Sequence, residues 1–254
     1  MITWQQIDNN RKPFIRMGER LYGGILTKIR RSLIVDLRQL ERPAQVEMVL
    51  DQFVIDEDMW DAYNKFYTRA VPFFAKDFLK RYKSGKGPTE IKQEDEWIEE
   101  ILRWVRNNSG EKITSVIQNH YEDIKRIARA AVETGIDEGW GMDKIARLIS
   151  REQGEIDLWK ALRIARTETV AASNYGVELG AEELPGTKKK VWISSFTTTS
   201  REDHMAMDGI MVDLGQPFDV AGESLMYPGD PTGSPGNIIN CRCAHEVIIT
   251  DEIY

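Results

Sequence analysis

The sequence has few of the residues that hold small secreted or metal-rich proteins together, since its 254 residues include two cysteines and three histidines. Cys241 and Cys243 are two positions apart, and a disulfide between such neighbours would need a strained loop. No stretch approaches the roughly 18 uninterrupted apolar residues of a membrane span, and the segment MITWQQIDNNRKPF has no apolar signal core. We therefore expect reduced thiols, a reducing compartment and no membrane anchor.

Basic residues are outnumbered by acidic ones, 34 against 41, which gives a formal net charge of -7. This balance excludes a protein whose whole surface coats nucleic acid. Two short basic runs, Lys188–Lys190 and Lys28 with Arg30 and Arg31, leave a local contact with DNA open, although such runs are usually solvated surface. The hydrophobic residues, 41% of the chain with seven tryptophans, suffice for the cores of one or two domains.

Apolar residues recur at spacings of three or four through most of the sequence before residue 185, which predicts amphipathic helices. The stretch 14–40 fits this pattern. The stretch 57–83 is rich in aromatic residues that we expect in a helix-bundle core, with a break or kink at Pro72. His120 lies within the apolar stripe of a further helix, and we expect it to be packed and hydrogen-bonded there.

Residues 138–152 predict a loop and a short helix, and a long helix is expected to begin near Asp157. Small residues recur along one side of this long helix, so we expect another backbone to approach it closely. They are Ala161, Ala165, Ala172 and Gly176.

The helical period ends near residue 185. Short apolar runs at 188–194, 209–214 and 245–250 alternate with Gly, Pro and Asp, which predicts a small antiparallel β region. The segment 227–237 contains three prolines and three glycines and predicts a long loop of the kind that is often functional. The expected fold class is therefore α+β, with a predominantly helical N-terminal part and a small antiparallel β-containing C-terminal domain.

An ordered set of short motifs runs from the long helix to the second cysteine, over about residues 135–249. With this set the chain resembles the phage Mu F-like minor head proteins, the phage head morphogenesis family. The set comprises IARTE (164–168), Asn174, Gly176, Trp192, Arg201 with His204 and Gly209, Phe218, YPGDP (227–231) and NCRC (240–243).

The resemblance implies a minor capsid protein of a tailed phage, present in few copies at the portal vertex or in the head interior. Such a protein takes part in head assembly and in DNA packaging or ejection. Its implied partners are the portal protein, other head proteins and phage DNA, and its implied locations are the virion and, during assembly, the host cytoplasm. A phage gene beside those for terminase and portal would support this interpretation.

The resemblance also suggests a division of the chain. Residues 1–130 would form a helical region that contacts portal or head, and residues 131–254 a Mu F-like α+β domain. The sequence departs from the family at 196–199, where Phe-Thr-Thr-Thr stands in place of an acidic residue before the histidine. Chemistry that depends on that acid is not expected here.

The cysteine pair could form a metal site. On an extended strand Cys241, Cys243 and His245 would share one face, with the two cysteine Cα atoms about 7 Å apart and within reach of one zinc ion. His245 would lie about 13 Å from Cys241, too far to bind the same ion. His204 could supply a ligand instead, which gives Cys241, Cys243 and His204 as a candidate zinc site.

Two other interpretations remain open. In the first, Arg166, Glu168, Arg201 and His204 form a buried polar cluster that ties the long helix to the β region, and the cysteines are reduced, buried and close to His204. In the second, the chain is a hydrolase or group transferase centred on His204 and the Cys241/Cys243 pair. No G-x-S-x-G turn presents a serine nucleophile, so this enzyme would use a thiol of lowered pKa.

Overall fold

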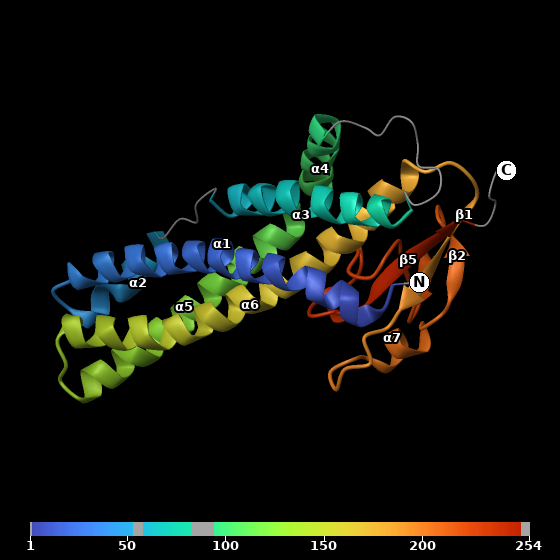
Figure 1. Ribbon diagram of the computed structural model, residues 1–254. Coiled ribbons are helices and arrows are strands. Elements are labelled where there is room, and N and C mark those ends of the chain that lie inside the picture. Colours follow the sequence, from blue (N-terminus) through green and yellow to red (C-terminus); the bar gives the residue numbers. More distant parts are fainter. Residues whose placement is uncertain (1, 53–57, 83–93, 250–254) are drawn as a thin grey trace.

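The computed structural model describes residues 2–52, 58–82 and 94–249 (Figure 1). Its helices are α1 (Trp4–Arg38), the short 3-10 helix η1 (Pro43–Gln45), α2 (Val46–Gln52), α3 (Asp58–Tyr82), α4 (Glu94–Asn108), α5 (Gly110–Asp137), α6 (Met142–Glu182), α7 (Glu202–Ala206) and α8 (Pro235–Ile238). Its strands are β1 (Lys188–Ile193), β2 (Met211–Asp213), β3 (Phe218–Val220), β4 (Glu223–Leu225) and β5 (Ala244–Ile249).

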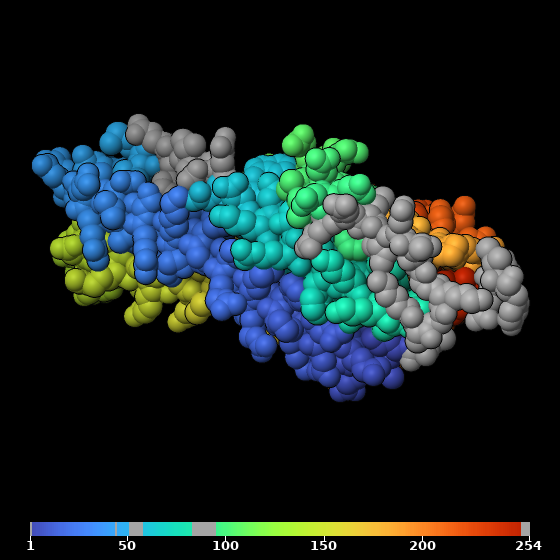
Figure 2. Space-filling model, turned by 45° about the horizontal axis from the view of Figure 1, so that its top comes forward, coloured from blue at the N-terminus to red at the C-terminus, as the bar shows by residue number. Residues whose placement is uncertain are grey.

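The long helices α1, α5 and α6 lie side by side and reach away from the small β-containing unit at one end (Figure 1). In the space-filling view the molecule is elongated, and α1 runs along its length (Figure 2). This arrangement confirms the expected α+β class with a helical N-terminal part. The predicted domain boundary at residue 130 falls within α5, and the division itself stays a prediction. Among the described helices, none has both the length and the apolar character needed to cross a membrane.

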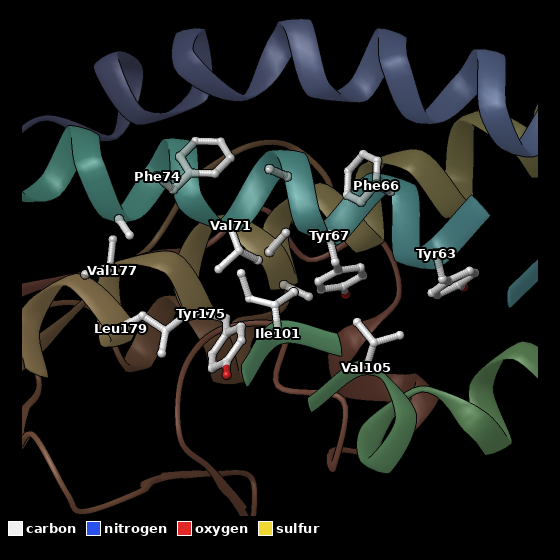
Figure 3. Packing of buried hydrophobic residues seen from close by; sticks show 14 of the residues in the cluster. Tyr63, Phe66, Tyr67, Val71, Phe74, Ile101, Val105, Tyr175, Val177 and Leu179 are labelled. Carbon is white, nitrogen blue, oxygen red and sulfur yellow. The ribbon is translucent and has the colours of Figure 1, made fainter. Parts of the chain in front are cut away.

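The aromatic face of α3 forms the main core, as expected from the sequence. Figure 3 shows Tyr67 and Val71 of α3 on the side of α4, whereas Phe66 and Phe74 point toward α1. The rings of Phe66 and Phe74 pack against Tyr22 and Phe14 of α1, with centroids 5.8 Å and 5.0 Å apart. Burial of these side chains drives the packing of α3 against α1, α4 and α6. Helix α3 continues through Pro72, which is itself buried. Of the break or kink expected at this position, the break is therefore wrong, and the kink stays a prediction.

Small residues on α6 allow close packing at two levels of the helix, which confirms the close approach predicted for it. A Cβ atom built on Gly176 would lie 2.7 Å from the carbonyl oxygen of Val71. About three turns earlier on the helix, a Cβ on Gly18 of α1 would lie 2.9 Å from the Cβ of Ala165. The backbones of α3 and α1 therefore approach α6 where it lacks bulk.

Helix α6 is longer than the sequence indicates. It begins at Met142, whereas we expected a short helix and a second start near Asp157. The helix continues through Gly154, where a Cβ atom would lie 2.1 Å from Nη1 at the end of the Arg30 side chain. This glycine therefore does not end the helix.

The C-terminal unit contains two small antiparallel sheets, with strand orders β2-β1-β5 and β3-β4. In the first sheet Trp192 pairs with His245 and Lys189 pairs with both Asp213 and Ile248. Strand β5 begins at Ala244, so the two cysteines precede it. Our expectation that Cys241, Cys243 and His245 share one strand face is therefore wrong.

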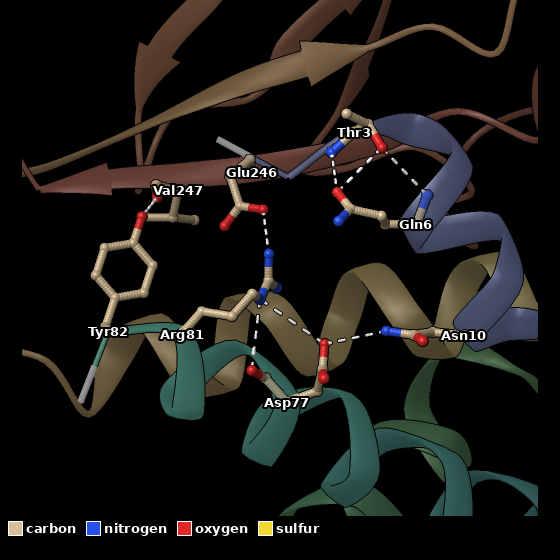
Figure 4. A network of polar contacts seen from close by, with 8 residues as sticks. All are labelled: Thr3, Gln6, Asn10, Asp77, Arg81, Tyr82, Glu246 and Val247. Carbon is tan, nitrogen blue, oxygen red and sulfur yellow. Dashed lines mark hydrogen bonds and ion pairs between the residues drawn. The ribbon is translucent and has the colours of Figure 1, made fainter. Parts of the chain in front are cut away.

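A polar network joins α1, α3 and β5 beside this unit (Figure 4). Arg81 of α3 donates to Glu246 of β5 (2.5 Å) and lies 3.7 Å from Asp77, which accepts a hydrogen bond from Asn10 of α1 (3.4 Å). Tyr82 donates to the carbonyl oxygen of Val247. The two helices are thus tied to the central part of β5.

Candidate metal centre

The structure brings together three side chains that the sequence singled out. His204 of α7 lies with its Nδ1 3.5 Å from Sγ of Cys241 and 3.7 Å from Sγ of Cys243. The three ligand atoms lie within 4.8 Å of one another, and all three residues are buried. Both thiols are free. This group can hold a metal ion by its chemistry, because imidazole and thiolate are the preferred ligands of zinc.

The ring of His204 is fixed from the side opposite the thiols. Its Nε2 lies 3.3 Å from Oδ1 of Asn237, and the ring packs edge-to-face against Trp192 with centroids 5.5 Å apart. The Asn237 amide is held in turn, since its Nδ2 donates to the carbonyl oxygen of Val220. Ser194 donates to the backbone carbonyl of His204 itself.

The two thiols share a hydrogen bond that separates their acidities. The hydrogen bond from Cys241, followed by the contacts with His204 and the backbone of Ser195, lowers the pKa of Cys243. The same hydrogen bond, together with burial, raises the pKa of Cys241. One thiolate next to one thiol is the arrangement that these contacts favour.

The cysteine segment, residues 241–243, is held in place by the buried guanidinium of Arg11 on α1. It donates to the carbonyl oxygens of Arg242 (3.0 Å) and Cys243 (3.2 Å) and to the side chains of Ser173 (2.7 Å) and Asn174 (3.2 Å) of α6. Burial lowers its pKa to about 10, so the group stays protonated at neutral pH.

Arg11 was missed by the reading of the sequence. Its partners lie between 162 and 232 positions away in the sequence and leave no local pattern. The available signal was its phase, because Arg11 is seven residues before the buried Gly18 and falls on the same stripe as Tyr22 and Leu26. A charged residue on an apolar stripe indicates a buried partner.

The motifs of the predicted family meet around this segment. Asn174 donates to the carbonyl oxygens of Pro228 (2.6 Å) and Cys243 (3.3 Å), which joins the YPGDP loop to the NCRC segment. Gly229, with φ +81°, lets that loop lie against α6, since a Cβ atom there would be 3.1 Å from Val170. Asp230 closes the loop by accepting from the backbone of Met226 (2.7 Å).

The four residues of the expected polar cluster do not lie in one place. Arg201 donates to the carbonyl oxygen of Ile239 (2.7 Å), close to the His204 centre. Glu168 is buried elsewhere, where it accepts from Tyr67 (2.7 Å) and pairs with Lys112 (3.0 Å). Arg166 is half-buried on α6, and among the described residues no hydrogen bond or ion pair joins it to the other three.

A neighbouring residue of the IARTE motif does tie the helix to the cysteine segment. Thr167 accepts a hydrogen bond from the backbone of Asn240 (3.0 Å) and donates to the carbonyl oxygen of Arg163 (2.9 Å). The link between long helix and β unit thus exists, carried by Thr167, Asn174 and Arg11.

His245 belongs to a separate site. Its Nε2 lies 2.8 Å from Glu178 of α6, which also pairs with Lys190 (3.4 Å). Lys190 is fully buried and donates to the carbonyl oxygen of Met226 (2.6 Å), so it is not a surface residue that contacts DNA. In the second basic run, Lys28 pairs with Asp58 and Arg30 lies 3.4 Å from Asp157, while Arg31 is exposed.

His120 is buried between the long helices, as expected, and its Nδ1 lies 3.8 Å from Asp157. Neither ring nitrogen has a hydrogen-bond partner among the described residues, so the expected hydrogen bond is missing. Burial lowers its pKa to about 4.

The chain shares sequence similarity with proteins of Enterococcus faecalis and Bacillus subtilis. It is 30% identical over 138 residues to the NAD(+)--arginine ADP-ribosyltransferase EFV of Enterococcus faecalis, a match covering 53% of this chain and 28% of that protein. It is 26% identical over 156 residues to the uncharacterized protein YqbB of Bacillus subtilis, covering 60% of this chain and 50% of that protein. The chain thus spans half or less of these relatives.

No solved structure matches the chain. Residues 126–246 match the model of the family described as phage Mu protein F like protein. The matched residues extend from α5 to β5 and include α6, the YPGDP loop, His204 and both cysteines. Over residues 126–246 the chain is therefore similar to the phage Mu F-like family.

Proposed function

We propose that the chain is a minor head protein of a tailed phage that acts at the portal vertex or in the head interior, where it takes part in head assembly and in DNA packaging or ejection. The observation that carries this proposal is the family match over residues 126–246, because this family points to phage head morphogenesis. The portal protein and other head proteins would be its partners.

The elongated shape of the molecule supports separate roles for the helical part and the C-terminal unit. The helical part reaches away from the C-terminal unit and offers a long surface to other head proteins (Figures 1 and 2). Exposed apolar side chains stand near its far end, namely Val35, Met48 and Ile136. The formal net charge of -7 and the burial of Lys190 leave only local patches for contact with phage DNA.

Mass spectrometry of purified virions and proheads tests this proposal. We expect the chain in both particles, at fewer copies than the major capsid protein, and in complexes isolated through the portal protein. A non-structural protein encoded by the same phage serves as the control for carry-over. Absence from virions, proheads and portal complexes would overturn the assignment.

An enzyme centred on His204, Cys241 and Cys243 is the second candidate function. Two observations favour it. A thiol lies next to an imidazole, and the enterococcal relative, of which the match covers 28%, is named as an ADP-ribosyltransferase. Each cysteine is only 2% exposed, so a large substrate cannot reach the thiols. Rapid alkylation of a thiol in the native protein would favour the enzyme, and protection until unfolding would favour the structural role.

A further inference from the structure

The geometry of the His204, Cys241 and Cys243 group matches the edges of a metal tetrahedron. In a zinc site, bonds of about 2.3 Å to sulfur and about 2.0 Å to nitrogen place a nitrogen and a sulfur ligand about 3.6 Å apart. The two Nδ1–Sγ distances of His204 are 3.5 Å and 3.7 Å. The imidazole nitrogen is thus already at the separation from both sulfur atoms that one ion would require, and the three ligand atoms lie within 4.8 Å of one another.

The hydrogen bonds behind His204 select the nitrogen that faces the thiols. Because Nδ2 of Asn237 donates to the carbonyl oxygen of Val220, its Oδ1 is the atom that faces Nε2 of His204 and accepts a hydrogen bond from the Nε2–H group. The proton then resides on Nε2, and Nδ1 presents a lone pair to Cys241 and Cys243. Metal-binding histidines are oriented by an outer partner in the same way.

Charge balance favours a divalent ion in this place. Two thiolates offset the charge of one Zn²⁺, so the loaded centre carries no net charge in a buried site, where an unpaired charge is costly. Among the described residues, no carboxylate or further histidine joins the group. A small polar cavity lies beside it, lined in part by Ser195, Thr197 and Ser200, and can hold a water molecule.

The C-terminal unit has a structural need for such a link. Its own apolar cluster is small, comprising Val170, Trp192, Phe218, Val220, Leu225 and the two cysteines. Three of its strands are three residues long. Small cores of this kind are commonly stabilised by a metal or by disulfides, and the two cysteines here are free.

We propose that Nδ1 of His204 and the thiolates of Cys241 and Cys243 bind one zinc ion, with water as the fourth ligand, and that this ion ties α7 to the segment before β5. The ion joins positions 37 and 39 residues apart in the sequence. It stabilises the unit because it binds the folded arrangement of its ligands and not the unfolded chain.

The test is metal analysis of the full chain, produced without a polyhistidine tag and dialysed against metal-free buffer. We expect about one zinc ion per chain, and a lower melting temperature after a strong chelator removes it. Replacement by Co²⁺ should give the charge-transfer and visible bands of a tetrahedral site with thiolate ligands. A chain that neither retains nor takes up zinc, and whose melting temperature a chelator leaves unchanged, would overturn the proposal.

Variants then assign the ligands. C241S, C243S and H204A should each lose zinc, whereas H204C should retain it with a changed Co²⁺ spectrum. The matched control is His245→Gln, which alters the other buried histidine of this unit and should keep the ion. The zinc content and chelator response of the wild-type chain test whether an ion is bound, and they do not depend on whether a variant folds. Retention of zinc by folded C241S and C243S would refute this ligand set.

Discussion

The helical part and the C-terminal unit bury their polar side chains in different ways. Between α1, α5 and α6 the interior is an apolar stripe that includes Leu33, Ile124 and Ile145, and His120 lies beside it without a hydrogen bond among the described residues. Where the helices meet the C-terminal unit, buried side chains such as Arg11 of α1 and Asn174 of α6 donate to backbone carbonyls of its loops. Helices satisfy their own backbone, whereas irregular segments need side chains to do so.

Removing Arg11 should produce the largest effect of this comparison. Arg11→Met keeps the apolar stem but removes the four hydrogen bonds that the buried guanidinium donates to Arg242, Cys243, Ser173 and Asn174, so we expect a loss of about 3 kcal/mol in the free energy of unfolding. Urea denaturation measures it. Lys12→Ala, at the neighbouring exposed position, should change stability by no more than about 0.5 kcal/mol. Equal effects of the two variants would contradict the contrast between the regions.

His120 tests the helical part through pH. Its pKa is lowered from 6.5 to about 4 by burial, so the unfolded chain takes up this proton first as pH falls. Stability should therefore be full above pH 6.5 and decline toward pH 4, by up to about 3 kcal/mol. Burial raises the pKa of Asp157, which acts in the opposite direction and reduces the net decline.

The matched variant for this experiment is His120→Leu, which has no proton to gain. We expect its unfolding free energy, measured by urea denaturation, to vary less between pH 6.5 and pH 4 than that of the wild type. Parallel curves for the two proteins would show that His120 does not titrate between the folded and unfolded states.

Two glycine-to-alanine substitutions test the close packing of α6, with smaller expected effects on stability. Gly176→Ala should cost about 1–3 kcal/mol, because the new Cβ would lie 2.7 Å from the carbonyl of Val71. Gly24→Ala on α1 has no atom within 4 Å of its Cβ and should stabilise by about 0.5–1 kcal/mol. Melting temperatures that move in the same direction would disprove close packing at α6.

Periodic apolar residues predicted the helical part, because one stripe of the helix must face the core. The predictions of a helix break or kink at Pro72 and of a helix start near Asp157 were misled. Both residues are buried within continuous helices, and the sequence alone does not show the neighbouring helices that bury them. The C-terminal β region was likewise recognisable from its short runs and turn residues.

The candidate site was only partly predictable. The likeness of the motifs indicated that His204 lies near Cys241 and Cys243, and the structure has them in contact. Arg11 and Asn237 could not be found in this way, because their partners are set by tertiary structure. Lys190 was taken for part of a surface run, but a strand alternates its side chains, and this one points inward to Glu178.

The contacts of α1 with the cysteine segment also set an order in time. Arg11 and Trp4 donate to the carbonyl of Arg242, which follows them by 231 and 238 residues. At synthesis rates of about 5–20 residues per second, this partner is made on the order of 10 to 50 s after Arg11, and the guanidinium stays solvated until then. The first helix can form early, but its buried arginine finds its place only at a late step, when the cysteine segment closes the longest loop of the fold.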